Sequence, residues 1–130
     1  LRCLVGSEMC IRDSFLHRVP YEKTPEVYAA CDILLKTSLL ESFSYPPLEM
    51  MASGGYVVAV PNGGNLEYLK DGENCILYPQ GNLAEAKAAI ERILTDAELR
   101  KKLDTGAEET VKERNWKRIE PQILEQYLGK

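Results

Sequence analysis

From Phe15 onward, short apolar runs alternate with segments that have the residue spacing of amphipathic helices, and this alternation constrains the fold more than any other feature. The runs 32–37 and 56–60 are mostly apolar, as is typical of strands in a parallel sheet that helices cover on both faces. Residues 75–78 form a third, shorter run. Strands that alternate with helices predict the α/β class, here with about three parallel strands flanked by helices and followed by C-terminal helices.

Helix signals are clearest after the third run. Asn82 and Glu85 have the spacing of a capping box, and Asp96 is placed to cap a further helix. Gly106 allows a break in that helix, because glycine is a poor helix former. A last apolar stripe extends over 116–128. A complete doubly wound sheet has five or six strands, so the chain corresponds to the second half of such a domain.

A loop follows the first predicted strand and leads into a short helix. It reads Glu41-Ser42-Phe43-Ser44-Tyr45-Pro46-Pro47-Leu48-Glu49. Because Pro46 precedes a proline it should avoid the helical region, so we expect Pro47 to open the helix and Glu49 to lie in its first turn. The helix should stop near Gly54. Carboxylates suit sugar hydroxyls and helix N-termini suit phosphates, so the loop predicts a site for both.

Composition argues against several other functions. The net charge of -4 does not suit a nucleic-acid binder that works through a basic surface. No apolar run approaches the roughly 20 residues that span a bilayer, and no apolar core of a secretory signal is visible. We expect free thiols in a reducing compartment and no metal site, because His17 stands alone and the cysteines lack ligand spacing. The cysteines are Cys3, Cys10, Cys31 and Cys75.

The first residues have a different character. The stretch from Leu4 to Ser14 shows neither the period of a strand nor that of a helix. It is similar to translated sequencing-adapter read-through at the ends of environmental assemblies. We therefore expect residues 1–14 to be a non-native or disordered segment, the alternative being an ordinary strand and turn.

The motifs together resemble a known family. Its signature elements occur here in the same order along the chain. They correspond to residues 15–20, Tyr28 to Asp32, the Glu41–Glu49 loop with Met51-Ala52-x-Gly54, residues 63–67 and residues 71–74. The chain resembles the retaining glycosyltransferases of the two-Rossmann-domain (GT-B) fold, in the family 4-like group called glycosyl transferases group 1. The resemblance extends from Phe15 to about Tyr127, and it implies a partial Rossmann-like domain.

The resemblance implies roles for individual residues. Glu49 would hold the ribose hydroxyls of the nucleotide, and Glu41 would lie near the transferred sugar as the catalytic carboxylate. The backbone at Arg18 and Val19 would meet the nucleobase. Main-chain amides near the helix start would meet the sugar and the diphosphate, and these belong to Ser42, Phe43, Ser44, Tyr45 and Leu48. The family usually has glycine where His17 and Ser44 stand, which puts the shape of the donor pocket in question. No metal or cofactor is implied.

The implied organisation is a donor-binding domain over 15–114 and a C-terminal crossover helix over 115–130. The acceptor-binding N-terminal domain and the strands that carry the basic residues for the diphosphate would lie outside the chain. The parent would move a sugar from a nucleotide diphosphate-sugar to a glycan or lipid-linked acceptor with retention of configuration. It would be cytoplasmic, or peripheral at the inner face of the membrane, and the fragment alone would be inactive.

Two alternatives stay open at the level of sequence. A nucleotide-sugar epimerase shares the two-domain fold, and a catalytic His or Asp in the other half would distinguish it. A non-catalytic nucleotide-binding or interaction module of flavodoxin-like shape would instead carry an acidic cluster after its first strand and a lysine after its last. Neither of those last two features stands in a suitable place in the sequence.

Overall fold

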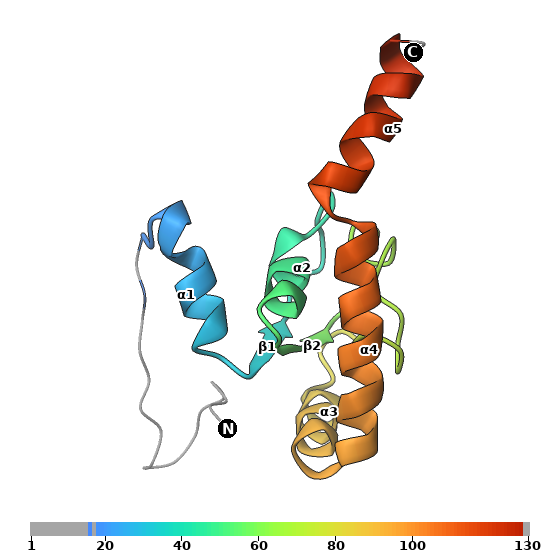
Figure 1. Cartoon of the computed structure of the whole chain (residues 1–130). Helices are drawn as coiled ribbons and strands as arrows, with labels where there is room; N and C mark the ends of the chain where they lie inside the picture. The colour runs from blue at the N-terminus through green and yellow to red at the C-terminus, as the bar shows by residue number, and fades with distance from the viewer. Residues whose placement is uncertain (1–15, 17, 129–130) are drawn as a thin grey trace.

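The computed structural model describes residue 16 and residues 18–128 of the chain. Figure 1 shows this part and labels the helices α1 to α5 and the strands β1 and β2. In chain order the helices and strands are η1 (Tyr21–Lys23), α1 (Thr24–Ala29), β1 (Ile33–Lys36), α2 (Tyr45–Ala52), β2 (Tyr56–Ala59), β3 (Ile76–Leu77), α3 (Leu83–Thr95), α4 (Ala97–Glu113) and α5 (Trp116–Leu128). The segment 1–14, which includes Cys3 and Cys10, lies outside the described residues, and so does His17.

The sheet has the order β1-β2-β3, and both strand pairs are parallel. In register, Ile33 of β1 lies opposite Tyr56, and Val58 of β2 lies opposite Ile76. The central strand β2 is the most buried, with Val57, Val58 and Ala59 fully covered. The predicted α/β domain with three parallel strands, flanking helices and C-terminal helices is confirmed.

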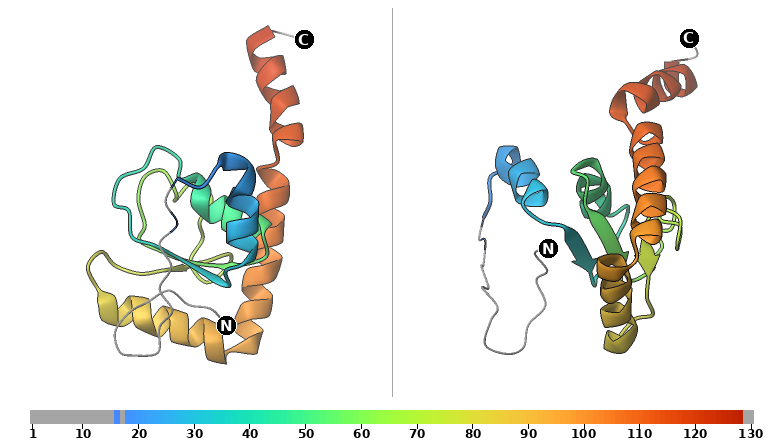
Figure 2. Two further views of the ribbon diagram at one scale, coloured as in Figure 1. Left: turned by 90° about the vertical axis from the view of Figure 1, so that its left-hand side faces the viewer. Right: turned by 60° about the horizontal axis from the view of Figure 1, so that its bottom comes forward.

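Helices cover both faces of the sheet. Neighbouring residues of β2 point to opposite faces, so they pack against different helices. Val58 packs in a cluster with Ile93 of α3, whereas Val57 packs in a cluster with Met50 of α2. The long helix α4 contributes Leu103 to the first cluster and Ala107 to the second. Figure 2 shows α4 lying along the side of the sheet, so one helix closes both halves of the core.

The helix caps predicted at Asn82 and Asp96 are confirmed, and the predicted break at Gly106 is wrong. The Glu85 amide donates to Asn82 Oδ1 at 3.1 Å, and the Leu99 amide donates to Asp96 Oδ1 at 2.9 Å. Helix α4 continues through Gly106 without interruption. A Cβ at Gly106 would lie 2.3 Å from the carbonyl oxygen of Glu73, so this glycine permits close packing and does not end the helix.

The start of α2 also differs from the prediction. The helix begins at Tyr45, so Pro46 adopts helical geometry and Glu49 lies in the second turn. Both prolines stand where a helix leaves its N–H groups without intrahelical partners, so their missing donors cost nothing there. The preference of a residue before proline for extended backbone is therefore overcome. Near Gly54, which has φ +80°, the helix ends as predicted.

Helix α5 extends beyond the end of α4 and away from the sheet (Figures 1 and 2). None of its residues is buried, and Trp116 and Tyr127 are 67% and 80% exposed. The C-terminal helix predicted over 115–130 is therefore present over Trp116–Leu128, with its aromatic side chains uncovered. Over residues 16 and 18–128, no helix combines the length and apolar character needed to cross a membrane.

Candidate functional site

The site lies at the carboxyl edge of the sheet, where the loops after β1 and β2 meet. The carboxyl ends of parallel strands share one edge, and α/β domains bind ligands there. The side-chain amide of Asn62, after β2, donates to the carbonyl of Ser38, after β1, at 3.0 Å. This bond joins two loops that lie 24 residues apart in the chain.

A buried pair of asparagines fixes the second of these loops. Asn62 Oδ1 accepts hydrogen bonds from the amides of Gly64 at 3.1 Å and Asn65 at 3.0 Å. The fully buried Asn65 in turn donates to the carbonyl of Val60 at 2.9 Å. All of these polar groups are satisfied, as buried polar groups must be, so the loop is held by specific bonds.

Gly64 brings this loop against the Glu41–Tyr45 segment. A Cβ on Gly64 would lie 2.5 Å from the carbonyl oxygen of Glu41 and 2.8 Å from the amide nitrogen of Phe43. Real Cβ atoms do not approach backbone atoms so closely, so the position accepts only glycine without movement of the chain. The predicted donor loop therefore rests directly on the backbone of the loop after β2.

The residue before α2 has a strained backbone. Ser44 adopts φ 69° and ψ 75°, the left-handed region that glycine occupies without penalty. It is buried, Tyr68 donates its hydroxyl proton to the Ser44 carbonyl, and the Ser44 hydroxyl has no hydrogen-bond partner among the described residues. Ser44 therefore holds a backbone conformation that costs a non-glycine residue free energy.

Aromatic contacts hold the loop from the other side. The ring of Phe43 lies 5.1 Å from that of Tyr45 and 5.3 Å from that of Tyr68, measured between centroids. The guanidinium of Arg114, at the end of α4, lies 5.9 Å from the Phe43 centroid. The predicted site residue Phe43 is therefore packed inside the loop, and its side chain supports the backbone amides on either side.

Glu41 has a cationic partner that the sequence analysis missed. Lys36 is the last residue of β1, and its ammonium forms an ion pair with Glu41 Oε1. The hydrogen bond from Lys36, aided by Ser38, lowers the pKa of Glu41 below its ordinary value. The available signal was a lysine in an otherwise apolar strand directly before the loop.

Glu49 lies in a different environment. It lines a cavity of about 420 Å³ between η1, α1 and α2, together with residues that include Tyr21, Tyr28 and Ser53. Burial, and then a hydrogen bond to Glu49, raise the pKa of Tyr28 to about 12, so the tyrosine stays a proton donor to this carboxylate. The two glutamates of the motif thus face different neighbours, Lys36 for Glu41 and Tyr28 for Glu49.

The other predicted site residues are spread around the loop and the segment before η1. Ser42 is exposed, and Leu48 packs its side chain against the core cluster that contains Met50. Arg18 is exposed and has φ 53°, while Val19 is partly covered. Neither Arg18 nor Val19 is among the residues that line the Glu49 cavity.

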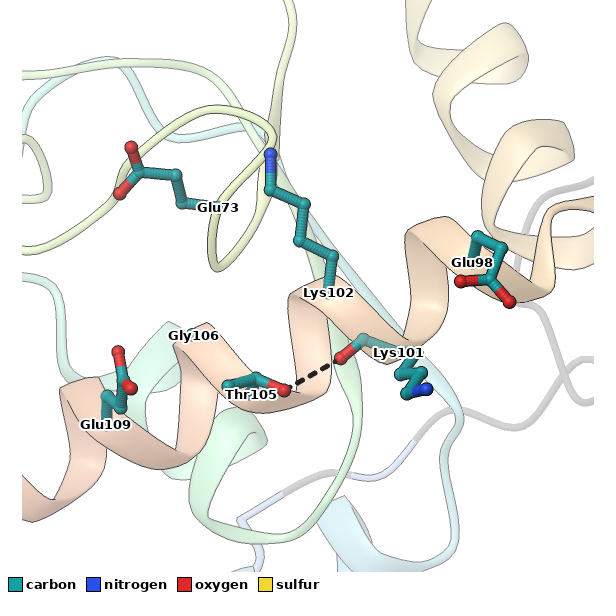
Figure 3. Close-up of a pocket in the computed structure, with 7 residues that line it drawn as sticks. All are labelled: Glu73, Glu98, Lys101, Lys102, Thr105, Gly106 and Glu109. Atoms are coloured by element: carbon teal, nitrogen blue, oxygen red, sulfur yellow. Dashed lines mark hydrogen bonds between the residues drawn. The ribbon is translucent and has the colours of Figure 1, made fainter.

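A second hollow of about 450 Å³ lies along α4, between Glu98 and Glu109, and includes Glu73 (Figure 3). Its charged side chains are all exposed, and the interaction drawn there is a local helix bond from the Thr105 hydroxyl to the carbonyl of Lys101 at 3.0 Å. The hollow contains none of the predicted site residues. Within residues 16 and 18–128, no group of three or more His, Cys, Asp or Glu side chains is arranged to hold a metal ion.

Cys31 and Cys75 are free thiols, as predicted. Cys75 is completely buried within the core cluster that contains Met50, and burial raises the pKa of its thiol to about 12. A thiol in that state is inert at neutral pH, because the thiolate is the reactive form. Its role is therefore packing.

The amino-acid sequence of the chain is similar to those of known bacterial proteins. O-antigen biosynthesis protein RfbC of Myxococcus xanthus is 35% identical over 117 residues, which are 88% of this chain and 9% of that protein. D-inositol 3-phosphate glycosyltransferase of Stackebrandtia nassauensis is 29% identical over 125 residues, which are 95% of this chain and 28% of that protein.

Two solved structures share the fold. HepE of Anabaena in complex with UDP has a TM-score of 0.75 and 28% identity, over 82% of this chain and 30% of that chain. Sucrose-phosphate synthase from Thermosynechococcus elongatus has a TM-score of 0.80 and 27% identity, over 89% of this chain and 29% of that chain. The chain thus spans less than a third of the length of each of these four proteins. The sequence model of the family Glycosyl transferases group 1 matches residues 12–110, and the chain belongs to this family.

Proposed function

We propose that the chain is the C-terminal donor-binding part of a longer glycosyltransferase. The longer protein transfers a sugar from a nucleotide diphosphate-sugar to a glycan or lipid-linked acceptor, with retention of configuration. The observation that carries this proposal is the Glu41–Tyr45 loop, which leads into the N-terminus of α2 at the carboxyl edge of a parallel sheet. The UDP and UDP-glucose complexes of HepE support a nucleotide-sugar donor.

The loop offers the electrostatics that a departing diphosphate needs. A helix N-terminus carries about half a positive charge, and preorganised amides stabilise negative charge that develops in a transition state. Because Pro46 and Pro47 have no N–H, the amides of Ser44 and Tyr45 are the donors at this helix start without an intrahelical acceptor. In a regular helix the Leu48 amide is directed to the Ser44 carbonyl.

The two glutamates divide the donor between them in this proposal. Glu49 accepts hydrogen bonds from the ribose hydroxyls within its cavity, where Tyr28 orients the carboxylate. Glu41 accepts a hydrogen bond from the transferred sugar at the loop. The acceptor would be held by a domain outside this chain, as the short coverage of the relatives suggests.

Replacing Glu49 with alanine tests the ribose role. In the complete protein, Glu49→Ala should weaken UDP binding by roughly 1–3 kcal/mol, about 5- to 150-fold, because charge-assisted hydrogen bonds to the ribose are lost. Isothermal titration with UDP gives the affinity. Glu91→Ala is the matched control, because this exposed glutamate on α3 pairs with the nearby Lys87 and is not among the residues that line the Glu49 cavity. A Glu49→Ala protein that binds UDP as tightly as the Glu91→Ala protein would exclude the ribose role.

The isolated chain provides a second test. Titration of the 130-residue chain with uridine or guanosine diphosphate should show a dissociation constant no tighter than roughly millimolar. The reason is that the acceptor domain and the basic residues for the diphosphate would be absent. A radiolabelled transfer assay should detect no sugar transfer by the chain alone. Measurable transfer would contradict the division of the enzyme into donor and acceptor parts.

A further inference from the structure

Lys36 occupies an unusual place for a lysine. It ends β1, a strand whose other three residues are apolar, and its side chain is only 15% exposed. Alternate residues of a strand share a face, and Leu34 packs in the core cluster with Met50 of α2. The Lys36 side chain therefore lies on the face that α2 covers, above Leu34 and toward the start of α2. A lysine so covered is rare unless its charge is paired.

The ammonium of Lys36 is held by groups of the predicted donor loop. It donates to Ser38 Oγ at 2.5 Å and forms the ion pair with Glu41 Oε1. The backbone carbonyl of Lys36 accepts a hydrogen bond from the Val60 amide at 3.0 Å, and the backbone carbonyl of Ser38 accepts one from the side-chain amide of Asn62. Both β1 and the loop after β2 therefore fix the position of this cation.

The ion pair between Lys36 and Glu41 reduces the electrostatic repulsion that the proposed function implies between the Glu41 carboxylate and the diphosphate of the donor. A bare carboxylate at Glu41 would repel the diphosphate that is expected to bind at the other end of the same loop, where α2 begins. An ammonium in contact with that carboxylate cancels most of its field, and the effect is largest where water is excluded. A paired carboxylate still has lone pairs for a sugar hydroxyl, because two oxygens offer about four acceptor positions.

We propose that Lys36 is a positioning residue of the donor site, which neutralises and orients Glu41 so that a carboxylate and a diphosphate can occupy the same loop. This inference rests on the proposed function. In this proposal Lys36 affects donor binding through Glu41 and makes no direct bond to the phosphates.

A double-mutant cycle in the complete protein tests the proposal, with UDP as the probe. Lys36→Met should lower UDP affinity about tenfold when Glu41 is present, because the carboxylate is then uncompensated. In the Glu41→Gln background, the same Lys36→Met change should alter UDP affinity by less than about threefold, since no charge remains to neutralise. Lys36→Arg keeps the charge and should stay within about threefold of the unmodified protein. Thermal unfolding of each variant shows whether it is folded, and Lys36→Gln replaces Lys36→Met if the latter fails to fold.

Two results would overturn the proposal. One is an unchanged UDP affinity after Lys36→Met. The other is an equal loss with and without Glu41, which would mean that the ammonium acts on the phosphates directly. If the unmodified complete protein binds no UDP or UDP-glucose, the proposed function itself fails. An unmodified protein that binds UDP, with a Lys36→Met variant that binds it equally well, refutes this inference alone.

Discussion

Replacing Gly64 with alanine is expected to weaken UDP binding by the complete protein about 10- to 100-fold. The new Cβ would lie 2.5 Å from the Glu41 carbonyl oxygen and 2.7 Å from the Ser42 carbonyl carbon. Both are backbone atoms that cannot rotate away, so the Glu41–Tyr45 loop, which is proposed to bind the donor, must move. A displacement on the order of 1 Å at a positioned site costs about 100-fold in function. Isothermal titration with UDP measures the loss.

The neighbouring glycine supplies the control. A Cβ on Gly63 meets nothing within 4 Å, and neither glycine has positive φ. Gly63→Ala therefore restricts the unfolded chain as Gly64→Ala does, but leaves the loop in place. We expect it to bind UDP within about twofold of the unmodified protein, as surface substitutions usually have small effects. Equal affinities for the two variants would show that close packing on Gly64 does not position the Glu41–Tyr45 loop for UDP binding.

Replacing Gly106 with alanine is expected to destabilise the 130-residue chain by about 1–3 kcal/mol. Helix propensity alone predicts the opposite, a gain of about 1 kcal/mol for alanine in a helix interior. The change in stability is expected to be a loss, because the added Cβ would lie 2.3 Å from the Glu73 carbonyl oxygen and 3.3 Å from Asn74 Cα. Urea unfolding followed by circular dichroism measures the free energy of unfolding.

The cost at Gly106 is large because the buried side chain of Asn74 ties the turn before β3 to α4 at this point. The side-chain amide of Asn74 donates to the carbonyl of Tyr68 at 2.7 Å and to Thr110 Oγ1 at 2.8 Å. Moving α4 outward to admit a methyl group would stretch the bond to Thr110. Thr105→Ala, at the exposed neighbouring position, is the control, and it should change stability by no more than about 0.5 kcal/mol. A Gly106→Ala chain as stable as the control would exclude the close contact.

The sequence was most informative where the signal is local. A capping side chain bonds within three residues, so Asn82 and Asp96 could be recognised from spacing alone. The strand at 56–60 could be predicted because a strand buried on both faces must be apolar at every position. The Glu41–Glu49 loop could be placed at the end of a strand for the same reason, since the apolar run directly precedes it.

The start of α2 could not be predicted correctly because two local rules compete there. The residue before a proline prefers extended backbone, yet proline is favoured in the first turn of a helix. The structure resolves the competition in favour of Tyr45 as the first helical residue, with the left-handed Ser44 before it. Tyr68, whose hydroxyl bonds the Ser44 carbonyl, lies 24 residues away, so no local pattern could reveal that support.

The sequence by itself determined the α/β class, the helix caps and the loop that carries the two glutamates, because each depends on residues close together in the chain. Only the tertiary structure decided that Lys36 pairs with Glu41, that Gly64 packs against the Glu41–Tyr45 loop and that Gly106 admits the backbone of Glu73. The last two contacts join residues more than 20 positions apart, and Lys36 meets Glu41 only because the loop after β1 turns back over the strand end. Such pairings depend on how the sheet and helices pack, which the order of residues does not display.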